Sequence, residues 1–306
     1  GFHDWLILEK SDGVGGTWRD NSYPGSGCDV PSMFYSFSFE PKTDWTRKFA
    51  EQPEILQYIE FCADKYNLRP QMRFNTELAT ATFDDDQAVW TLTTTTGETL
   101  RARFLISGCG QLNRPLYPDI PGRESFTGKS IHTARWDHHY PLEGKRVAVI
   151  GNGASAVQMV PPVVNRVAQM TLFQRSANWI FPKPDRPFTD RERAIFTKFP
   201  LANKLYRAFL WTMFEIRWPV FHKGSKLGKN LQDKTEKDIR SQVHDPNLMD
   251  AVIPDYQIGC KRILISNDYY NALQQDNVDV IRDHIAEITP DGLTTQDGTH
   301  YQVDAI

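Results

Sequence analysis

The sequence lacks closely spaced cysteine pairs, because its four cysteines lie far apart, at Cys28, Cys62, Cys109 and Cys260. This spacing predicts no zinc or other metal site and no dithiol redox centre, which argues against a dithiol flavin reductase. Reduced thiols in a cytoplasmic protein are the simplest interpretation.

Long apolar runs and a strong excess of one charge are also missing. No run is long enough to span a bilayer, so no membrane span is expected, and no secretory signal is recognisable. The formal net charge is −3, which gives no indication of a nucleic-acid partner or of a charged tail. The length of 306 residues is sufficient for about two domains.

A glycine-containing segment follows the apolar run Val147-Ala-Val-Ile150 and has the pattern of a dinucleotide site. The run predicts a buried strand. The first glycine suits a tight turn, the second lets a pyrophosphate approach the backbone, and a small residue follows where helix meets strand. The candidate binding residues are Gly151, Gly153, Ala154, Ser155 and Ala156. Alone, such a glycine pattern is weakly specific.

A second pattern lies just before this segment and makes it more specific. Residues 126–137 read F-x-G-x-x-x-H-x-x-x-W-D, with the fixed positions Phe126, Gly128, His132, Trp136 and Asp137. Together the two patterns resemble the Baeyer–Villiger monooxygenases, flavoenzymes that use FAD, NADPH and dioxygen. Related N- and S-oxygenating flavin monooxygenases have a similar pattern but usually lack the Trp of the Trp136-Asp137 pair.

The resemblance covers essentially the whole chain but matches an interior segment of that family. It implies an α/β chain with two dinucleotide-binding (Rossmann-like) domains, an inserted antiparallel β-meander and a helical subdomain. The implied domains are an FAD-binding domain at 1–141 and an NADPH-binding domain at 142–188 and 251–284, with a helical insertion at 189–250. Residues 285–306 are implied to be the truncated beginning of a segment that leads back to the FAD domain. The FAD glycine turn is expected before Gly1, and the C-terminal part that lines the substrate pocket after Ile306.

Local patterns agree with this organisation. The apolar run Trp5–Leu8 predicts a buried strand, and residues 76–83, 88–93 and 99–106 predict the three strands of the meander. Apolar residues between 195 and 216 predict amphipathic helices, and we interpret their apolar stripe as core packing, since charges within it argue against a span.

Two segments near the start are implied to bind FAD. Glu9 follows the first predicted strand, where an acidic residue binds ribose hydroxyls in dinucleotide folds. The nearby glycine-rich segment is implied to wrap the flavin, through Gly15, Gly16, Thr17 and Trp18. The alternatives are a solvated strand-end charge for Glu9 and an ordinary glycine turn for the segment.

Two cations are implied to select NADPH. Arg175 ends the predicted strand 171–175, where a basic residue can pair with the 2′-phosphate and an acidic one would select the free hydroxyl of NADH. Lys261 matches a family position that reaches the same phosphate. The alternatives are a surface arginine and a solvated Lys-Arg pair.

Three residues are implied to be catalytic. Arg262 matches the essential arginine of the family, which lies at the flavin and, being permanently charged, keeps a flavin peroxide in its nucleophilic form. Asp29 matches the acid that positions this arginine, although a lone loop Asp is more often a turn cap. His132 is expected to couple the two nucleotide domains; the alternative is a structural histidine in a linker.

The function implied by the resemblance is FAD- and NADPH-dependent insertion of one oxygen atom from O2 beside a ketone carbonyl, giving an ester or lactone through a flavin peroxide. A small-molecule ketone and O2 are the expected partners. The alternatives are an N- or S-oxygenating flavin monooxygenase and an inactive, truncated cofactor-binding fragment. Because a glycine turn and helix N-terminus supply much of a pyrophosphate site, the isolated chain is expected to bind FAD weakly.

Overall fold

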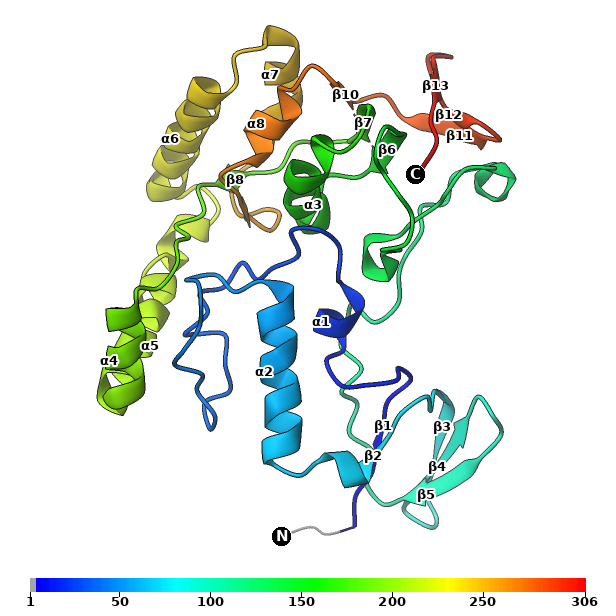
Figure 1. Cartoon of the computed structure of the whole chain (residues 1–306), viewed down its shortest axis with the longest axis vertical. Coiled ribbons are helices and arrows are strands. Elements are labelled where there is room, and N and C mark those ends of the chain that lie inside the picture. The colour runs from blue at the N-terminus through cyan, green and yellow to red at the C-terminus, as the bar shows by residue number, and fades with distance from the viewer. Residues whose placement is uncertain (1–3) are drawn as a thin grey trace. The chain divides into compact units, whose positions relative to one another are not determined.

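The computed structural model describes residues 4–306 and places them in two compact units (Figure 1). Of the described residues, unit 1 contains 4–22 and Gln52–Leu116, and unit 2 contains Tyr23–Glu51 and Tyr117–Ile306. Residues 23–51 and 117–141, which the sequence assigned to an FAD domain, therefore make most of their contacts within unit 2. None of the helices in residues 4–306 has the length and apolarity needed to cross a membrane.

Unit 1 contains a short parallel pair, one long helix and a β-meander. Strand β1 (Ile7–Leu8) pairs in parallel with β2 (Met72–Arg73), and η1 (Arg69–Gln71) precedes β2. The prediction of a buried strand over Trp5–Leu8 is wrong in its burial, because Ile7 and the two residues before it are exposed. Helices α1 (Thr17–Asp20) and α2 (Gln52–Lys65) follow β1 in the chain. The face of α2 that carries Ile55, Tyr58 and Cys62 is buried, as its helical spacing predicts.

The predicted antiparallel meander is present in unit 1. It consists of β3 (Leu78–Asp84), β4 (Val89–Thr94) and β5 (Thr99–Ala102), each paired with the next. The last strand is shorter than the predicted 99–106. It ends at Ala102, and Phe104 and Ile106 beyond it expose 76% and 90% of their surface.

Unit 2 is built around a parallel sheet of order β10-β7-β6, formed by β6 (Arg146–Ile150), β7 (Gln169–Phe173) and β10 (Val278–Ile281). Helix α3 (Ala154–Val164) connects β6 to β7, and α8 (Tyr269–Leu273) contacts α3. The apolar strands β6 and β7 are buried, as expected for a parallel sheet. A second, two-stranded parallel pair joins β8 (Ile180–Phe181) to β9 (Leu264–Ile265).

A small antiparallel sheet follows at the C-terminal side of unit 2. It contains β11 (Ile285–Thr289), β12 (Gly292–Thr295) and β13 (His300–Gln302). Its buried residues Ile288, Leu293 and Val303 pack with Ala148 and Phe173 of the parallel sheet. Two short 3-10 turns, η2 (Arg123–Ser125) and η3 (Thr133–Arg135), precede β6.

Helices were predicted for 189–250, and the structure has a helical region from 189 to 252. It comprises α4 (Asp190–Lys198), α5 (Pro200–Glu215), η4 (Trp218–Phe221), α6 (Lys226–Gln242) and α7 (Pro246–Val252). A capping box starts α4, because the Thr189 hydroxyl accepts from the Glu192 amide and the Glu192 carboxylate accepts from the Thr189 amide. The chain is thus mixed α/β, which confirms the coarse fold class. The interpretation of the whole 195–216 stripe as core is wrong, because many of the apolar side chains of α5 are exposed.

Candidate functional site

The glycine turn after β6 forms an open cradle in unit 2. Gly151 has φ +98°, a conformation that suits glycine, and its amide donates to the Phe173 carbonyl at 2.8 Å. Gly153 precedes the first turn of α3, which receives no side-chain cap. A Cβ added at Gly151 or Gly153 would meet nothing within 4 Å. The amides of Ala154, Ser155 and Ala156 belong to the first turn of this uncapped helix, a position that suits a pyrophosphate.

Cationic side chains lie at the carboxyl end of the neighbouring strand β7. Arg175 is exposed directly after the buried Gln174. Lys261 Nζ donates to Ser176 Oγ at 2.8 Å and lies 4.4 Å from the centre of the Tyr256 ring. The structure therefore brings Lys261 beside the residue that follows Arg175, although the two cations are far apart in sequence.

Asn152 joins the glycine turn to this strand end. Its Nδ2 donates to Gln174 Oε1 and to the Ser176 carbonyl, both at 2.8 Å. Its own carbonyl accepts from Asn178 Nδ2 at 2.7 Å. Asn152 thus ties the glycine turn to the strand end that carries the cations, the two parts that bind the phosphates in dinucleotide folds.

Asp29 and Arg262, the two predicted partners, lie together in unit 2. Arg262 Nη2 is 3.5 Å from Asp29 Oδ2. The aspartate side chain is 12% exposed and the arginine side chain 69% exposed. The carboxylate is therefore held within the protein, and most of the guanidinium is left available to a ligand.

Gln158 of α3, which the sequence interpretation missed, holds this aspartate in place. Its Nε2 donates to Asp29 Oδ1 and to the Gly27 carbonyl, both at 3.0 Å. Its Oε1 accepts from the Tyr23 hydroxyl at 2.8 Å and from the Gly27 amide at 3.3 Å. All four hydrogen-bonding positions of the amide are in use. An amide side chain in the predominantly apolar sequence of α3 is the signal that could have identified it.

The 126–137 segment makes structural contacts within unit 2. Lys129 pairs with Asp137, and this contact lowers the pKa of the Asp137 carboxyl. Backbone bonds tie Lys129 and Ile131 to the last residues of the chain, and Trp136 packs against the main apolar core. Phe126 packs with the small antiparallel sheet. Residues 133–135 form only one 3-10 turn with extended residues on both sides, so the helix that would put His132 and Trp136 on one face is not formed.

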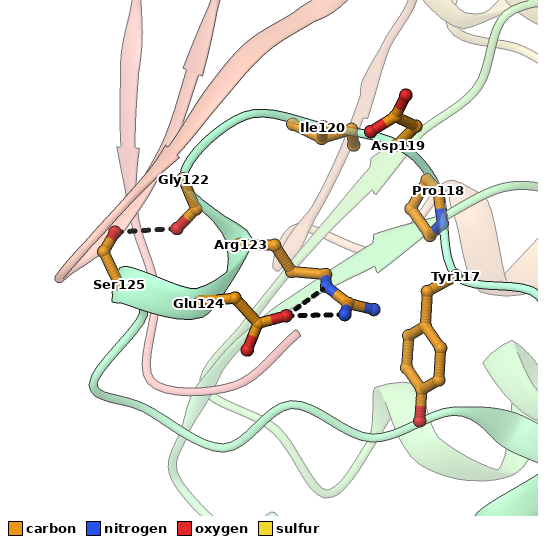
Figure 2. A pocket seen from close by; sticks show the side chains of 8 residues that line it. All are labelled: Tyr117, Pro118, Asp119, Ile120, Gly122, Arg123, Glu124 and Ser125. Carbon is orange, nitrogen blue, oxygen red and sulfur yellow. Dashed lines mark hydrogen bonds and ion pairs between the residues drawn. The ribbon is translucent and has the colours of Figure 1, made fainter.

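His132 caps this short turn. Its Nδ1 accepts from the Ala134 amide at 3.1 Å, and its ring lies edge-on to Tyr117 with 5.2 Å between ring centres. Tyr117 begins the segment 117–125, which lines an open pocket of about 680 Å³ (Figure 2). Arg123 lies 4.6 Å from the centre of the Tyr117 ring and pairs with Glu124. None of the predicted site residues lines this pocket.

The segment implied to bind FAD lies in unit 1. Glu9 is half-buried, and its Oε1 accepts from the Ser11 amide at 2.8 Å. Gly15 and Gly16 have φ +125° and +50°, and a Cβ at Gly16 would meet nothing within 4 Å. Thr17 and Trp18 begin α1 directly after these glycines. A Cβ at Gly15 would instead clash with the Leu56 side chain, so only Gly16 leaves its backbone open, and FAD binding by this segment stays a prediction.

Among residues 4–306 no group of three or more His, Cys, Asp or Glu side chains could hold a metal ion. All four cysteines are free thiols, with Cys28 and Cys62 buried and Cys109 and Cys260 exposed. Burial raises the pKa of the Cys28 thiol to about 11, so this cysteine remains protonated and unreactive at neutral pH.

Comparison with known proteins assigns the chain to a family. The sequence profile of the pyridine nucleotide-disulphide oxidoreductases matches residues 15–188, and the chain belongs to this family. It is 47% identical, over all of its 306 residues, to a Baeyer–Villiger monooxygenase of Pseudomonas aeruginosa, of which it covers 58%. The resemblance drawn from the sequence is thereby confirmed.

Two solved structures have the same fold over 98% of the chain. An oxidised steroid monooxygenase bound to NADP has a TM-score of 0.87 at 33% identity, and this chain covers 65% of it. A structure of OTEMO in complex with FAD and NADP has a TM-score of 0.88 at 31% identity, with the same coverage. The chain spans about three fifths of the length of the curated relatives it matches.

Proposed function

We propose that this chain carries the cofactor sites and the essential cation of a Baeyer–Villiger monooxygenase. The reaction is insertion of one oxygen atom from O2 beside a ketone carbonyl, with NADPH as reductant and FAD as the oxygen-activating cofactor. The observation that carries the proposal is the pairing of exposed Arg262 with enclosed Asp29, in the unit that also contains the glycine cradle and the cations Arg175 and Lys261.

Two dinucleotide-binding domains follow from this proposal. The NADPH domain comprises 142–188 and 251–284 around the β6-α3-β7 connection, with 189–250 as a helical insertion. The FAD domain comprises 1–141, and residues 285–306 return toward it. The solved relatives, one bound to NADP and one to FAD and NADP, support this division.

The residues of the cradle suit NADPH. The amides at the uncapped start of α3 would hold the pyrophosphate, because a helix N-terminus favours negative charge. Arg175 and Lys261 would pair with the 2′-phosphate and so select NADPH over NADH. Ser176 orients Lys261 through the 2.8 Å hydrogen bond, which leaves the ammonium two further donors for the phosphate.

The glycine-rich segment suits FAD. Gly16 presents bare backbone, whereas the Leu56 side chain covers Gly15, and Glu9 would accept hydrogen bonds from ribose hydroxyls. Thr17 and Trp18 would contact the flavin from the start of α1. When bound, FAD accepts hydride from NADPH and activates dioxygen, chemistry that amino-acid side chains do not supply.

Arg262 supplies fixed positive charge where the ketone is attacked. Arginine stays protonated at any working pH, so it donates hydrogen bonds without itself releasing a proton. It would stabilise the negative charge that develops on the carbonyl oxygen. Asp29 would orient the guanidinium, and His132 would couple the movements of the two cofactor domains.

The test is product analysis of the protein expressed from its natural reading frame. The purified protein is incubated with FAD, NADPH, air and a panel of cyclic, linear and aryl ketones, together with amines and thioethers. We expect ketones to gain one oxygen atom as esters or lactones. Oxygenation confined to the amines or thioethers would favour the N- or S-oxygenating alternative. Cofactor binding with no oxygenated product would favour a cofactor-binding module.

A further inference from the structure

Helix α5 of unit 2 presents an apolar stripe to solvent. Leu201, Leu205, Phe209 and Met213 are four residues apart along the helix, so they lie on one face. Ile216 continues this apolar stripe just beyond the end of the helix. Each exposes between 40% and 70% of its surface. We define the α5 stripe as Leu201, Leu205, Phe209, Met213 and Ile216.

The opposite face of the same helix packs on unit 2. Arg207 donates to the Met33 carbonyl at 2.6 Å and to Ser36 Oγ at 2.9 Å, and the Phe214 ring stacks on Phe34 at 6.2 Å. Asn203 and Leu210 are buried. The α5 stripe is therefore not needed to attach the helix to the protein. Because burial of apolar surface stabilises a fold, the exposed stripe contributes less to stability than a buried one would.

Further exposed aromatic and aliphatic residues follow α5 in the chain. Trp218, Phe221 and Leu227 expose 63%, 44% and 58% of their surface. Such a concentration of apolar side chains marks a contact surface for a protein or a membrane.

The charge of the segment that carries this surface is predominantly positive. Residues 198–230 contain seven cationic side chains and a single acidic one, Glu215, although the whole chain carries a net charge of −3. Arg207 faces inward, and the other six cations are exposed. They are Lys198, Lys204, Arg217, Lys223, Lys226 and Lys229.

We propose that the α5 stripe and its surrounding cations bind an anionic lipid surface. Exposed tryptophan, phenylalanine and leucine beside lysines are typical of helices that lie in a membrane interface. Lysine can place its alkyl stem along the apolar surface while its ammonium meets lipid phosphates. Protein interfaces are instead depleted in lysine, which accounts for five of the six exposed cations here.

The test is flotation of the purified protein with vesicles of phosphatidylcholine alone and of phosphatidylcholine mixed with phosphatidylglycerol. We expect binding to the anionic vesicles and little to the neutral ones, with weaker binding at higher salt. The triple variant Lys223→Gln, Lys226→Gln, Lys229→Gln should weaken binding roughly fivefold for each lysine. The double variant Leu205→Ser, Phe209→Ser should weaken it on the order of tenfold for each side chain.

Matched control variants show whether binding depends on this surface or on the total charge and apolar area of the protein. Lys234→Gln with Lys237→Gln removes two exposed lysines further along α6, and Ile106→Ser with Leu116→Ser removes two exposed apolar residues of unit 1. Both controls should bind like the unchanged protein, and thermal unfolding followed by circular dichroism should show that every variant is folded.

Three results would overturn the proposal. They are failure to float with anionic vesicles, equal binding to neutral vesicles, and loss of binding in the control variants as large as in the surface variants. Sedimentation of the protein alone identifies one further alternative. Self-association that depends on Leu205 and Phe209, without vesicle binding, would assign the stripe to a second copy of the chain and also overturn the proposal.

Discussion

Gln158 Nε2 donates a hydrogen bond to Asp29 Oδ1 over 3.0 Å, although the residues are 129 positions apart in the chain. The same aspartate faces Arg262 through its other oxygen. Helix α3, whose N-terminus forms the glycine cradle, thus also holds the acid that orients the proposed catalytic cation. This connection makes Gln158 a positioning residue for the proposed reaction.

Replacing Gln158 should disturb the orientation of Asp29 and Arg262 without weakening the binding of NADPH. Gln158→Leu leaves the Tyr23 hydroxyl and the Gly27 amide without their partner, at a cost of about 1–3 kcal/mol in the free energy of unfolding. Gln158→Glu places a second carboxylate beside Asp29. Both changes should lower kcat for ketone oxygenation about tenfold or more while KM for NADPH stays nearly constant. A changed KM with unchanged kcat would contradict the positioning role.

The cations after β7 should determine cofactor choice. Arg175→Ala and Lys261→Ala each remove a charge proposed to meet the 2′-phosphate, so KM for NADPH should rise about tenfold and KM for NADH should hardly change. Steady-state kinetics with both cofactors measures this. Arg166→Ala, which removes an exposed arginine paired with Glu143, is the control. Equal effects on NADPH and NADH would contradict the assignment.

Asp304 should stabilise unit 2 in a pH-dependent way. Hydrogen bonds from Arg146 lower the pKa of the Asp304 carboxyl from its ordinary 3.8 to about 2. Its stabilisation is therefore fully present above about pH 4 and is lost as the pH falls toward 2. Asp304→Asn should cost about 1 kcal/mol at neutral pH, a modest figure because the pair is partly solvated. Urea unfolding at pH 7 and pH 3 should show a smaller difference at pH 3; a constant difference would contradict the linkage.

Gly128 of the 126–137 segment should not tolerate a side chain. An added Cβ would lie 2.6 Å from the Asp304 carbonyl oxygen, a backbone atom that cannot turn away. Gly128→Ala should therefore destabilise unit 2 by about 1–3 kcal/mol through overpacking. Gly108→Ala is the matched control, because a Cβ there meets nothing within 4 Å. Thermal unfolding of the two variants gives the comparison, and equal midpoints would refute the steric argument.

Local sequence patterns were sufficient for much of the fold. The apolar run and glycines at 147–153 predict a strand, a turn and a helix, because these residue types favour such local backbone conformations. The alternating polar and apolar residues of the meander predict its strands for the same reason. The end of β5 was less predictable. Residues 103–106 have strand composition, but a strand also needs a partner, which local sequence does not reveal.

Long-range contacts explain what the sequence could not supply. Gln158 bonds to Gly27, Tyr23 and Asp29, all more than a hundred residues away, so no local spacing indicates its role. The stripe of α5 was interpreted as core, because periodicity shows that apolar residues share a face but not which face is covered. The Asp29–Arg262 pairing was anticipated only through the family resemblance.

The most direct test of the central claim is product analysis of Arg262→Ala, with Arg193→Ala, a surface arginine of α4, as the control. Removal of the fixed cation should lower ketone oxygenation by about 10²–10³-fold. NADPH oxidation should continue, with dioxygen reduced to hydrogen peroxide at the expense of NADPH, and Arg193→Ala should behave as the unchanged protein. Ester or lactone formation at the unchanged rate in Arg262→Ala would contradict the account.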